Sequence, residues 1–399
     1  MASKNPMPIN AAGAALLALL AGCDSGGGPV LAQPTAPGPS LFVVGDSLSD
    51  IGNAAAVADY LLGQPMYPEP SIGLCHPAER MLLDRDCADI LYRRSRVSDG
   101  PVAVEQLATR LGVALQPSFH TVPDRPVVGT NYAVAGAKAR GTTPRDLAHQ
   151  VDRLMLDHGA RLPQGAVVVL MIGGNDAIDA LQAAALPDLA DPTEGLPDPL
   201  DSAPPADPPS GAPDTEPAAI AAAAVGAIVE AASRLLDTGA CVIAANVPDL
   251  ARLPAVRDTA EQTGVDVPAA AALASEITTH FNADLAERLG QLADTHPSGA
   301  SLVSFDLYAG FQAALEAAAA AGANVTHACF DSERYIGSTL GERSFDPGCE
   351  PAPDAATPGF DGFFFWDGIH PTGMAHAALG SALVDTYETR CAAAFPTAR

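Results

Sequence analysis

Two patterns of apolar residues alternate along most of this chain. Short runs rich in β-branched residues, typical of buried strands, cover residues 41–44, 127–134, 167–172, 242–245 and 302–305. Longer segments with apolar residues at three- and four-residue spacing, the period of an amphipathic helix, cover residues 102–111, 147–156, 220–236 and 269–292. Strands that alternate with helices favour a parallel sheet covered on both faces. The pattern therefore predicts a three-layer α/β/α domain around a mostly parallel sheet of about five strands.

Regions without either pattern mark the limits of this domain. Residues 24–40 are rich in Gly and Pro, which predicts a flexible linker, and we expect one folded domain over residues 41–399. Residues from about 186 to 217 are crowded with Pro, Asp and Ala and offer too little apolar surface to offset the entropy of ordering. We interpret them as a disordered insertion, because strand and helix patterns continue on both sides. A linker between two domains is the alternative.

Residues 1–23 have the features of a bacterial export signal. Lys4 precedes an apolar run, Ala11–Ala21, that is too short to span a bilayer and suits the core of a signal peptide. The run leads into Leu20-Ala21-Gly22-Cys23, which resembles the lipobox of bacterial lipoproteins, in which the cysteine is lipidated and becomes the mature N-terminus. We expect a periplasmic or cell-surface protein held to a membrane by lipidated Cys23. An ordinary secretory peptide, which would release a secreted protein, is the alternative.

The cysteine content suits export. Of seven cysteines, six remain once Cys23 is set aside, an even number compatible with disulfides in an oxidising compartment. Two pairs lie close enough in sequence to close small loops, Cys75 with Cys87 and Cys329 with Cys349. Cys241 opens an apolar run, which favours a buried free thiol, and the sequence leaves Cys391 undecided. No cysteine or histidine spacing is typical of a metal site.

The net charge excludes one class of partner. The chain has 47 Asp and Glu against 21 Lys and Arg, for a formal charge of −26 at pH 7. Such a surface repels phosphate backbones, so we expect no nucleic-acid partner. The sequence does not indicate an oligomeric state.

A serine follows the first predicted strand. Gly45-Asp46-Ser47-Leu48-Ser49-Asp50 continues directly from residues 41–44. Open α/β sheets bind their ligands at this carboxyl edge, and Gly45 permits a tight turn there. An Asp-Ser helix cap is the alternative interpretation of this segment on its own.

Two later strand ends carry groups able to donate to a negative charge. Asn131–Ala137 places small residues around Gly136, where no side chain crowds the backbone N–H. Ile172-Gly173-Gly174-Asn175-Asp176 follows an apolar strand, and the Asn175 amide is a neutral donor. A close-packed turn at Gly136 and a turn or helix cap at Asn175 are the alternatives.

The segment Trp366-Asp367-Gly368-Ile369-His370-Pro371 supplies a base and a carboxylate. A serine hydroxyl needs a base to act as a nucleophile, and that base needs a carboxylate to fix its tautomer. The Asp-x-x-His spacing is weak evidence alone, because Asp146 and His149 share it inside a predicted helix. We assign this second pair to a solvated helix surface.

Together, in this order, the four segments resemble the sequence blocks of the GDSL hydrolases, also called the SGNH family. The resemblance implies Ser47 as nucleophile, His370 as base and Asp367 as its partner. It further implies an oxyanion hole formed by the N–H groups of Ser47 and Gly136 and the side-chain amide of Asn175. The family usually has Gly-Gly-Ala where this chain has Ala135-Gly136-Ala137, a change that keeps the aligned glycine.

Two further stretches, Arg96–Pro101 and Asn246–Leu250, resemble the same family without carrying its chemistry. The resemblance is strongest to the branch that holds bacterial secreted lipases, esterases and thermolabile haemolysin-like phospholipases. It implies a flavodoxin-like SGNH hydrolase fold and the hydrolysis of a small-molecule or lipid carboxylic ester through an acyl-serine, with no metal or organic cofactor. The alternatives are a phospholipase or acyltransferase, a polysaccharide O-deacetylase, and a surface lipoprotein that only binds.

Overall fold

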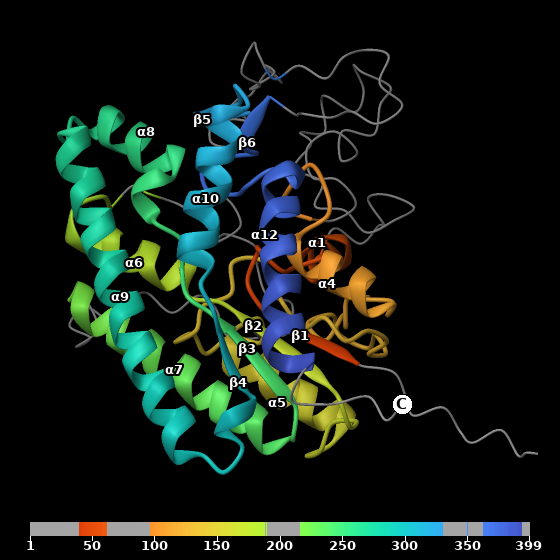
Figure 1. Cartoon of the computed structure of the whole chain (residues 1–399). Helices are drawn as coiled ribbons and strands as arrows, with labels where there is room; N and C mark the ends of the chain where they lie inside the picture. The colour runs from red at the N-terminus through yellow and green to blue at the C-terminus, as the bar shows by residue number, and fades with distance from the viewer. Residues whose placement is uncertain are drawn as a thin grey trace, which may run out of the picture. The chain divides into compact units, whose positions relative to one another are not determined.

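A four-stranded parallel sheet forms the centre of the protein (Figure 1). The computed structural model describes residues 40–61, 96–187, 189, 216–329, 349 and 362–392. The strands lie in the order β1 (Leu41–Gly45), β2 (Val167–Met171), β3 (Cys241–Ala245) and β4 (Leu302–Phe305). All residues of β1, β2 and β3 are buried, as expected for a sheet covered on both faces. The predicted strand ranges agree with these four to within one residue at each end.

The predicted strand at residues 127–134 is wrong as a full strand, although its end lies where a fifth strand would be. It meets the free edge of β1 through one isolated parallel bridge between Val43 and Asn131. Backbone N–H groups of Tyr132 and Val134 donate to the carbonyls of Val43 and Gly45 at 2.7 and 3.1 Å. The segment therefore extends the sheet locally and brings the residues after Val134 to its carboxyl edge.

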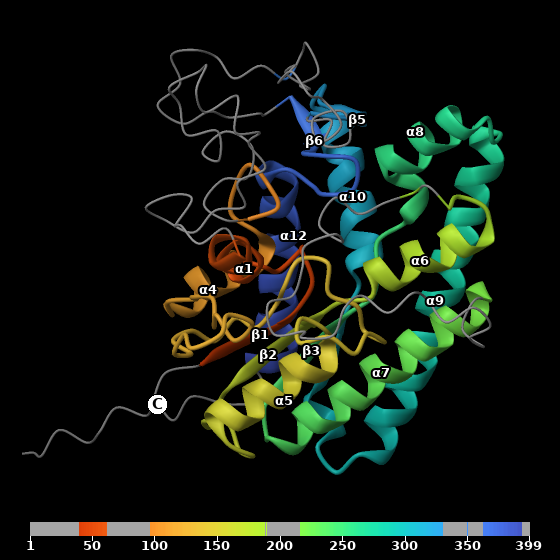
Figure 2. The ribbon, with the colours of Figure 1, turned by 180° about the vertical axis from the view of Figure 1, so that it is seen from behind.

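Helices cover the two faces of the sheet, so the predicted three-layer α/β/α arrangement is confirmed (Figures 1 and 2). One layer contains α4 (Ala103–Leu111), α10 (Leu307–Ala320) and α12 (Gly373–Thr386), with α4 and α10 both packed on α12. The other contains α5 (Leu147–His158), α6 (Gly174–Ala184), α7 (Pro217–Asp237) and α9 (Val267–Thr295). Shorter elements complete the described part, namely α1 (Asn53–Leu61), α8 (Pro254–Thr263), η2 (Leu250–Arg252), η3 (Gly299–Ser301) and the π-helical turn η4 (Tyr387–Cys391).

A second, two-stranded parallel sheet stands apart from the main one. It pairs β5 (Asn324–Ala328) with β6 (Phe363–Phe365). The sequence does not indicate this sheet, because β5 is only partly buried and contains three polar residues, while β6 is only three residues long.

The helix α7 is long and apolar enough to cross a membrane by length and composition. Its buried side chains, such as Ile228 and Leu235, belong to the hydrophobic core of the domain. Contacts with α6 and α9 place it as a covering helix of the sheet.

The prediction of a disordered insertion is wrong for its first residues. Leu186 and Leu189 are buried to 0% and 1% exposure and belong to the same core as the sheet. Their backbone N–H groups continue the end of α6 with bonds to the carbonyls of Leu181 and Leu186. Residues 190–215 lie outside the described part, so the insertion stays a prediction there.

The cysteines show one correction. Cys241, predicted as a free thiol, forms a disulfide with Cys391, with a Cα–Cα distance of 5.8 Å. The apolar run did predict burial, since both residues are 0% exposed, but the partner comes from the C-terminal turn η4, 150 positions away. The structure also joins Cys329 to Cys349. The predictions for Cys23, Cys75 and Cys87 fall outside the described residues.

Candidate active site

Ser47 lies in a tight turn at the carboxyl end of β1. The turn starts where Asp46 donates its backbone N–H to the carbonyl of Met171 on β2, and Asp46 Oδ1 accepts the N–H of Leu48. Glycine is required just before this turn, because a Cβ on Gly45 would lie 2.3 Å from the Met171 carbonyl oxygen. The close approach of β1 and β2 therefore presents Ser47 at the edge of the sheet.

Asp367 and His370 complete a hydrogen-bonded series with this serine. His370 Nε2 lies 2.8 Å from Ser47 Oγ, and His370 Nδ1 lies 2.8 and 2.9 Å from the two carboxylate oxygens of Asp367. Asp367 Oδ1 also accepts the backbone N–H groups of Ile369 and His370 at 2.9 and 2.8 Å. All three members of the series are at most 5% exposed. The carboxylate is thus held by its own turn, and it in turn fixes the imidazole.

The loop that carries His370 is fastened by the stretch Arg96–Pro101. Ser98 Oγ donates to the carbonyl of Pro371 at 3.0 Å, and Asp99 Oδ1 accepts the N–H of Gly373 at 2.6 Å. A Cβ on Gly100 would lie 2.9 Å from the Cα of Gly373, so the two backbones touch. This stretch, to which the sequence analysis gave no role in the chemistry, positions the histidine loop.

Three predicted oxyanion donors lie at the same edge of the sheet. Within the described residues, the backbone N–H groups of Ser47 and Gly136 donate to no protein acceptor, whereas those of Ala135 and Ala137 are bonded to Asp50 and Val134. Gly136 has φ +77°, a conformation that favours glycine. Asn175 is 6% exposed, and its Nδ2 donates one of its two N–H groups to the Ala137 carbonyl at 2.9 Å.

Sequence reasoning missed a buried network that joins the Ser47 turn to the Gly136 segment. Asp50 is fully buried and accepts the backbone N–H groups of Gly52, Asn53, Ala54 and Ala135. Burial raises the pKa of Asp50 above its usual value, and the four donors oppose that shift. Asn53 Nδ2 donates to the carbonyls of Asn131 and Ala133, and Asn131 Nδ2 donates to the carbonyl of Ser49. The signal in the sequence was the presence of the polar residues Asp50 and Asn53 just after Ser47 and of Asn131 at the start of the Gly136 segment.

Apolar side chains form the wall of the pocket beside Ser47, Asn175 and His370. They come from the end of β2, the segments that follow β1, β2 and β3, the helices α6, η2 and α10, and the histidine segment. The apolar lining residues are Leu48, Met171, Ile172, Ile178, Val247, Pro248, Leu250, Leu253, Leu307, Phe311, Ile369 and Pro371. The stretch Asn246–Leu250 thus contributes to the pocket wall. Such a lining suits the apolar part of a substrate.

Another histidine is buried next to the site. His376, on α12, is 1% exposed, and its Nδ1 accepts the N–H of Ala103 at 3.4 Å. Burial, with a smaller contribution from positive charge on His370, lowers the pKa of His376 to about 3. It is therefore neutral at physiological pH.

The second Asp-x-x-His pair is not a single surface pair. His149 is exposed, as predicted. The prediction for Asp146 is wrong: this residue is 4% exposed and precedes α5 as its N-cap position. Its carboxylate accepts the N–H of Lys138 and both the N–H and hydroxyl of Thr143. The Asp146 side chain turns back toward the loop that precedes α5. The apolar spacing of a helix does not predict such a contact.

A serine, a histidine and an aspartate in series, beside amide groups that can donate to an oxyanion, are the groups that acyl hydrolysis by serine needs. The fold and the site together place the protein in the class of α/β acyl hydrolases with a serine, histidine and aspartate in series. The sequence matches the family described as GDSL-like Lipase/Acylhydrolase over residues 41–383, and the chain belongs to this family. None of the curated proteins matches the chain in sequence. Family membership makes the protein an ester hydrolase in general terms.

The residues that the structure describes contain no group of three or more His, Cys, Asp and Glu able to hold a metal ion.

Proposed function

We propose that the protein hydrolyses carboxylic esters through an acyl-serine intermediate on Ser47. The observation that carries the proposal is the 2.8 Å contact between Ser47 Oγ and His370 Nε2, continued by the Asp367 carboxylate on the opposite ring nitrogen. The carboxylate accepts the Nδ1 proton of the neutral ring, which leaves Nε2 as the acceptor for the serine proton.

The reaction follows from this geometry. Ser47 Oγ attacks the ester carbonyl as His370 Nε2 takes its proton, and the resulting oxyanion accepts the N–H groups of Ser47 and Gly136 and the Asn175 amide. His370 then gives the proton to the leaving alcohol. Water attacks the acyl-serine by the same route, and the carboxylic acid leaves.

The pocket wall and the disulfides bear on substrate and location. The apolar side chains beside Ser47 and Asn175 favour an ester with an apolar acyl or alcohol part. Two buried disulfides favour an oxidising compartment. We therefore keep the proposal of an exported protein, with lipidation at Cys23 tested by mass spectrometry of the mature N-terminus.

Hydrolysis of p-nitrophenyl acetate and longer p-nitrophenyl esters tests the proposal. The purified wild type is expected to turn over at least one of them, and Ser47→Ala is expected to lose nearly all activity. Equal hydrolysis by both proteins would contradict the role of Ser47. A wild type inert toward every ester would favour the binding lipoprotein.

A further inference from the structure

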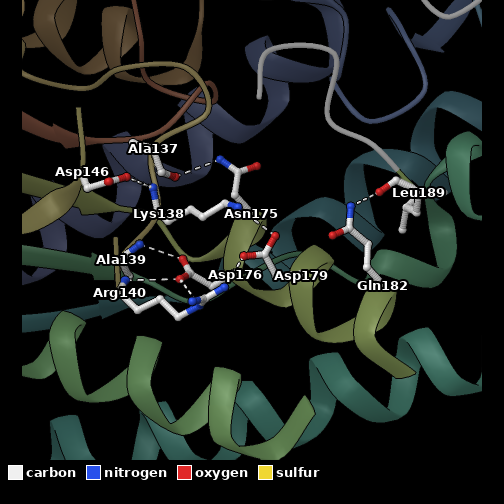
Figure 3. A network of polar contacts seen from close by, with 10 residues as sticks. All are labelled: Ala137, Lys138, Ala139, Arg140, Asp146, Asn175, Asp176, Asp179, Gln182 and Leu189. Atoms are coloured by element: carbon white, nitrogen blue, oxygen red, sulfur yellow. Dashed lines mark hydrogen bonds and ion pairs between the residues drawn. The ribbon is translucent and has the colours of Figure 1, made fainter. Parts of the chain in front are cut away.

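The loop that follows Gly136 is attached to α6 by a cluster of charged side chains (Figure 3). Asp176 lies at 0% exposure in the first turn of α6, and Asp179 lies one turn later on the same face. Lys138 and Arg140 project from the loop toward these two carboxylates. Four charges of balanced sign are thus gathered in one partly buried place.

Asp176 binds the backbone of the loop. Its Oδ2 accepts the N–H of Ala139 at 2.7 Å, and its Oδ1 accepts the N–H of Arg140 at 3.2 Å. The guanidinium of Arg140 also lies close, with Nε 3.6 Å from Oδ1. One carboxylate therefore holds two successive peptide groups.

Asp179 binds the side chains of the loop. Its Oδ1 accepts Lys138 Nζ at 2.9 Å, and its Oδ2 accepts Arg140 Nη2. Lys138 is the only lysine within the described residues. In a chain with so few cations, the use of two of them here concentrates the electrostatic attraction on this loop.

The cluster is next in sequence to two of the predicted oxyanion donors. Asp176 directly follows Asn175, and the attached loop begins directly after Gly136. The Asn175 amide itself donates to the carbonyl of Ala137, so its orientation depends on where the loop lies. Movement of the loop relative to α6 would displace the Gly136 N–H and the Asn175 side chain together.

We propose that Asp176 is a positioning residue that sets the spacing of the oxyanion donors by clamping residues 137–140 onto α6, with Lys138, Arg140 and Asp179 as its supporting ion pairs. This inference rests on the proposed ester hydrolysis. Burial, together with the charge of neighbouring Asp179, raises the pKa of Asp176 to about 6 against the opposing effect of two backbone donors and Arg140. Burial of a carboxylate at this position costs free energy. This cost fits a role in which both oxygens must accept backbone N–H groups, which a neutral amide does not fill.

The test is Asp176→Asn, which keeps the shape but turns one acceptor oxygen into a donor facing a backbone N–H. Misplaced donors weaken the transition state more than substrate binding. We expect kcat on a small ester to fall by about 10- to 100-fold, with KM changed less than about twofold. Affinity for a trifluoromethyl ketone, which forms an oxyanion on the serine, is expected to fall by the same factor as kcat.

Asp157→Asn is the matched control. Asp157 is a partly buried carboxylate that accepts the Tyr132 hydroxyl at 2.9 Å and Arg153 Nε at 3.0 Å, and neither partner belongs to residues 137–140 or to α6. The Asp157→Asn variant should have a lower melting temperature than the wild type, with unchanged kcat and unchanged affinity for the ketone. Lys138→Met provides a second variant, expected to lower kcat in the same direction should Asp176→Asn fail to fold.

The outcomes separate this inference from the proposed function. Wild-type hydrolysis lost on Ser47→Ala supports the proposed function. If Asp176→Asn and Lys138→Met then match the wild type in kcat and in affinity for the ketone, the positioning role is overturned and the proposed function stands. A fall in melting temperature without a change in kcat also overturns it, because it shows a purely structural role. An inert wild type removes both proposals.

Discussion

Replacement of Asp367 by Asn tests the geometry of the proposed base in detail. The asparagine oxygen takes the position of Asp367 Oδ1. There it still accepts the backbone N–H groups of Ile369 and His370, which lie 2.9 and 2.8 Å from Oδ1. The amide NH2 group then takes the position of Oδ2, 2.8 Å from His370 Nδ1. The retained oxygen also lies 2.9 Å from Nδ1, but it already accepts two backbone N–H groups. The NH2 group therefore donates to Nδ1, so the ring proton moves to Nε2 and faces Ser47 as a donor. In this tautomer His370 cannot accept the serine proton.

The magnitude follows from the interactions lost. A charge-assisted hydrogen bond contributes about 1.5–3 kcal/mol, and a buried donor left without an acceptor in the reactive tautomer costs about 1–3 kcal/mol. The two effects together amount to about 2.5–6 kcal/mol, or a loss of about 10²–10⁴ in kcat/KM. The fold should persist, because the side-chain volume and both backbone bonds remain.

The assay is kcat/KM for a p-nitrophenyl ester at neutral pH, with circular dichroism to check folding and Asp157→Asn as the control. The control is expected to stay near the wild-type rate. A folded Asp367→Asn variant within about threefold of wild type would refute the tautomer argument, since that equals less than about 1 kcal/mol.

Three further predictions concern the same site and its surroundings. His370→Ala and Ser47→Ala should each abolish nearly all turnover, and the double variant should lose little more, because members of one catalytic unit are not additive; rates of the three variants decide this. Asp146→Asn should lower the free energy of unfolding by about 1–3 kcal/mol, since it loses an acceptor for buried donors, whereas His149→Ala should change it by less than about 0.5 kcal/mol; urea unfolding of both variants separates buried from exposed. His376 has a folded pKa of about 3, below its ordinary value, so it stabilises the fold above about pH 6.5 and loses that contribution as pH falls toward 3. At pH 4.5 the loss should be about 2–3 kcal/mol, and unfolding of His376→Asn at pH 7 and 4.5 should show a correspondingly smaller decrease; an equal decrease in both proteins would contradict the assignment.

The sequence predicted the parts of the structure that local patterns encode. Ser47 and Asn175 follow strands of one parallel sheet, and the carboxyl ends of such strands must meet at one edge. The helices α10 and α12 were missed, because their many Ala and Gly residues weaken the contrast between buried and exposed faces on which the amphipathic period depends.

Other features depend on contacts between residues far apart in the chain. The Cys241–Cys391 disulfide spans 150 positions, so no spacing rule reveals it. Asp146 satisfies the spacing of a helix surface, yet its carboxylate turns back to Lys138 and Thr143. The hydrogen bonds of Asp50 and Asn53 to residues 131–135 likewise form only in the folded chain, so the local sequence does not reveal them.

The most direct test of the central claim is covalent labelling with a fluorophosphonate, followed by intact-mass measurement and peptide mapping. Only an activated serine reacts readily, and Ser47 is hydrogen-bonded to His370 Nε2 at 2.8 Å. The account predicts one phosphonyl group per chain, mapped to Ser47, and none on Ser47→Ala. An unlabelled wild type, or a label on another serine that persists in Ser47→Ala, would contradict it.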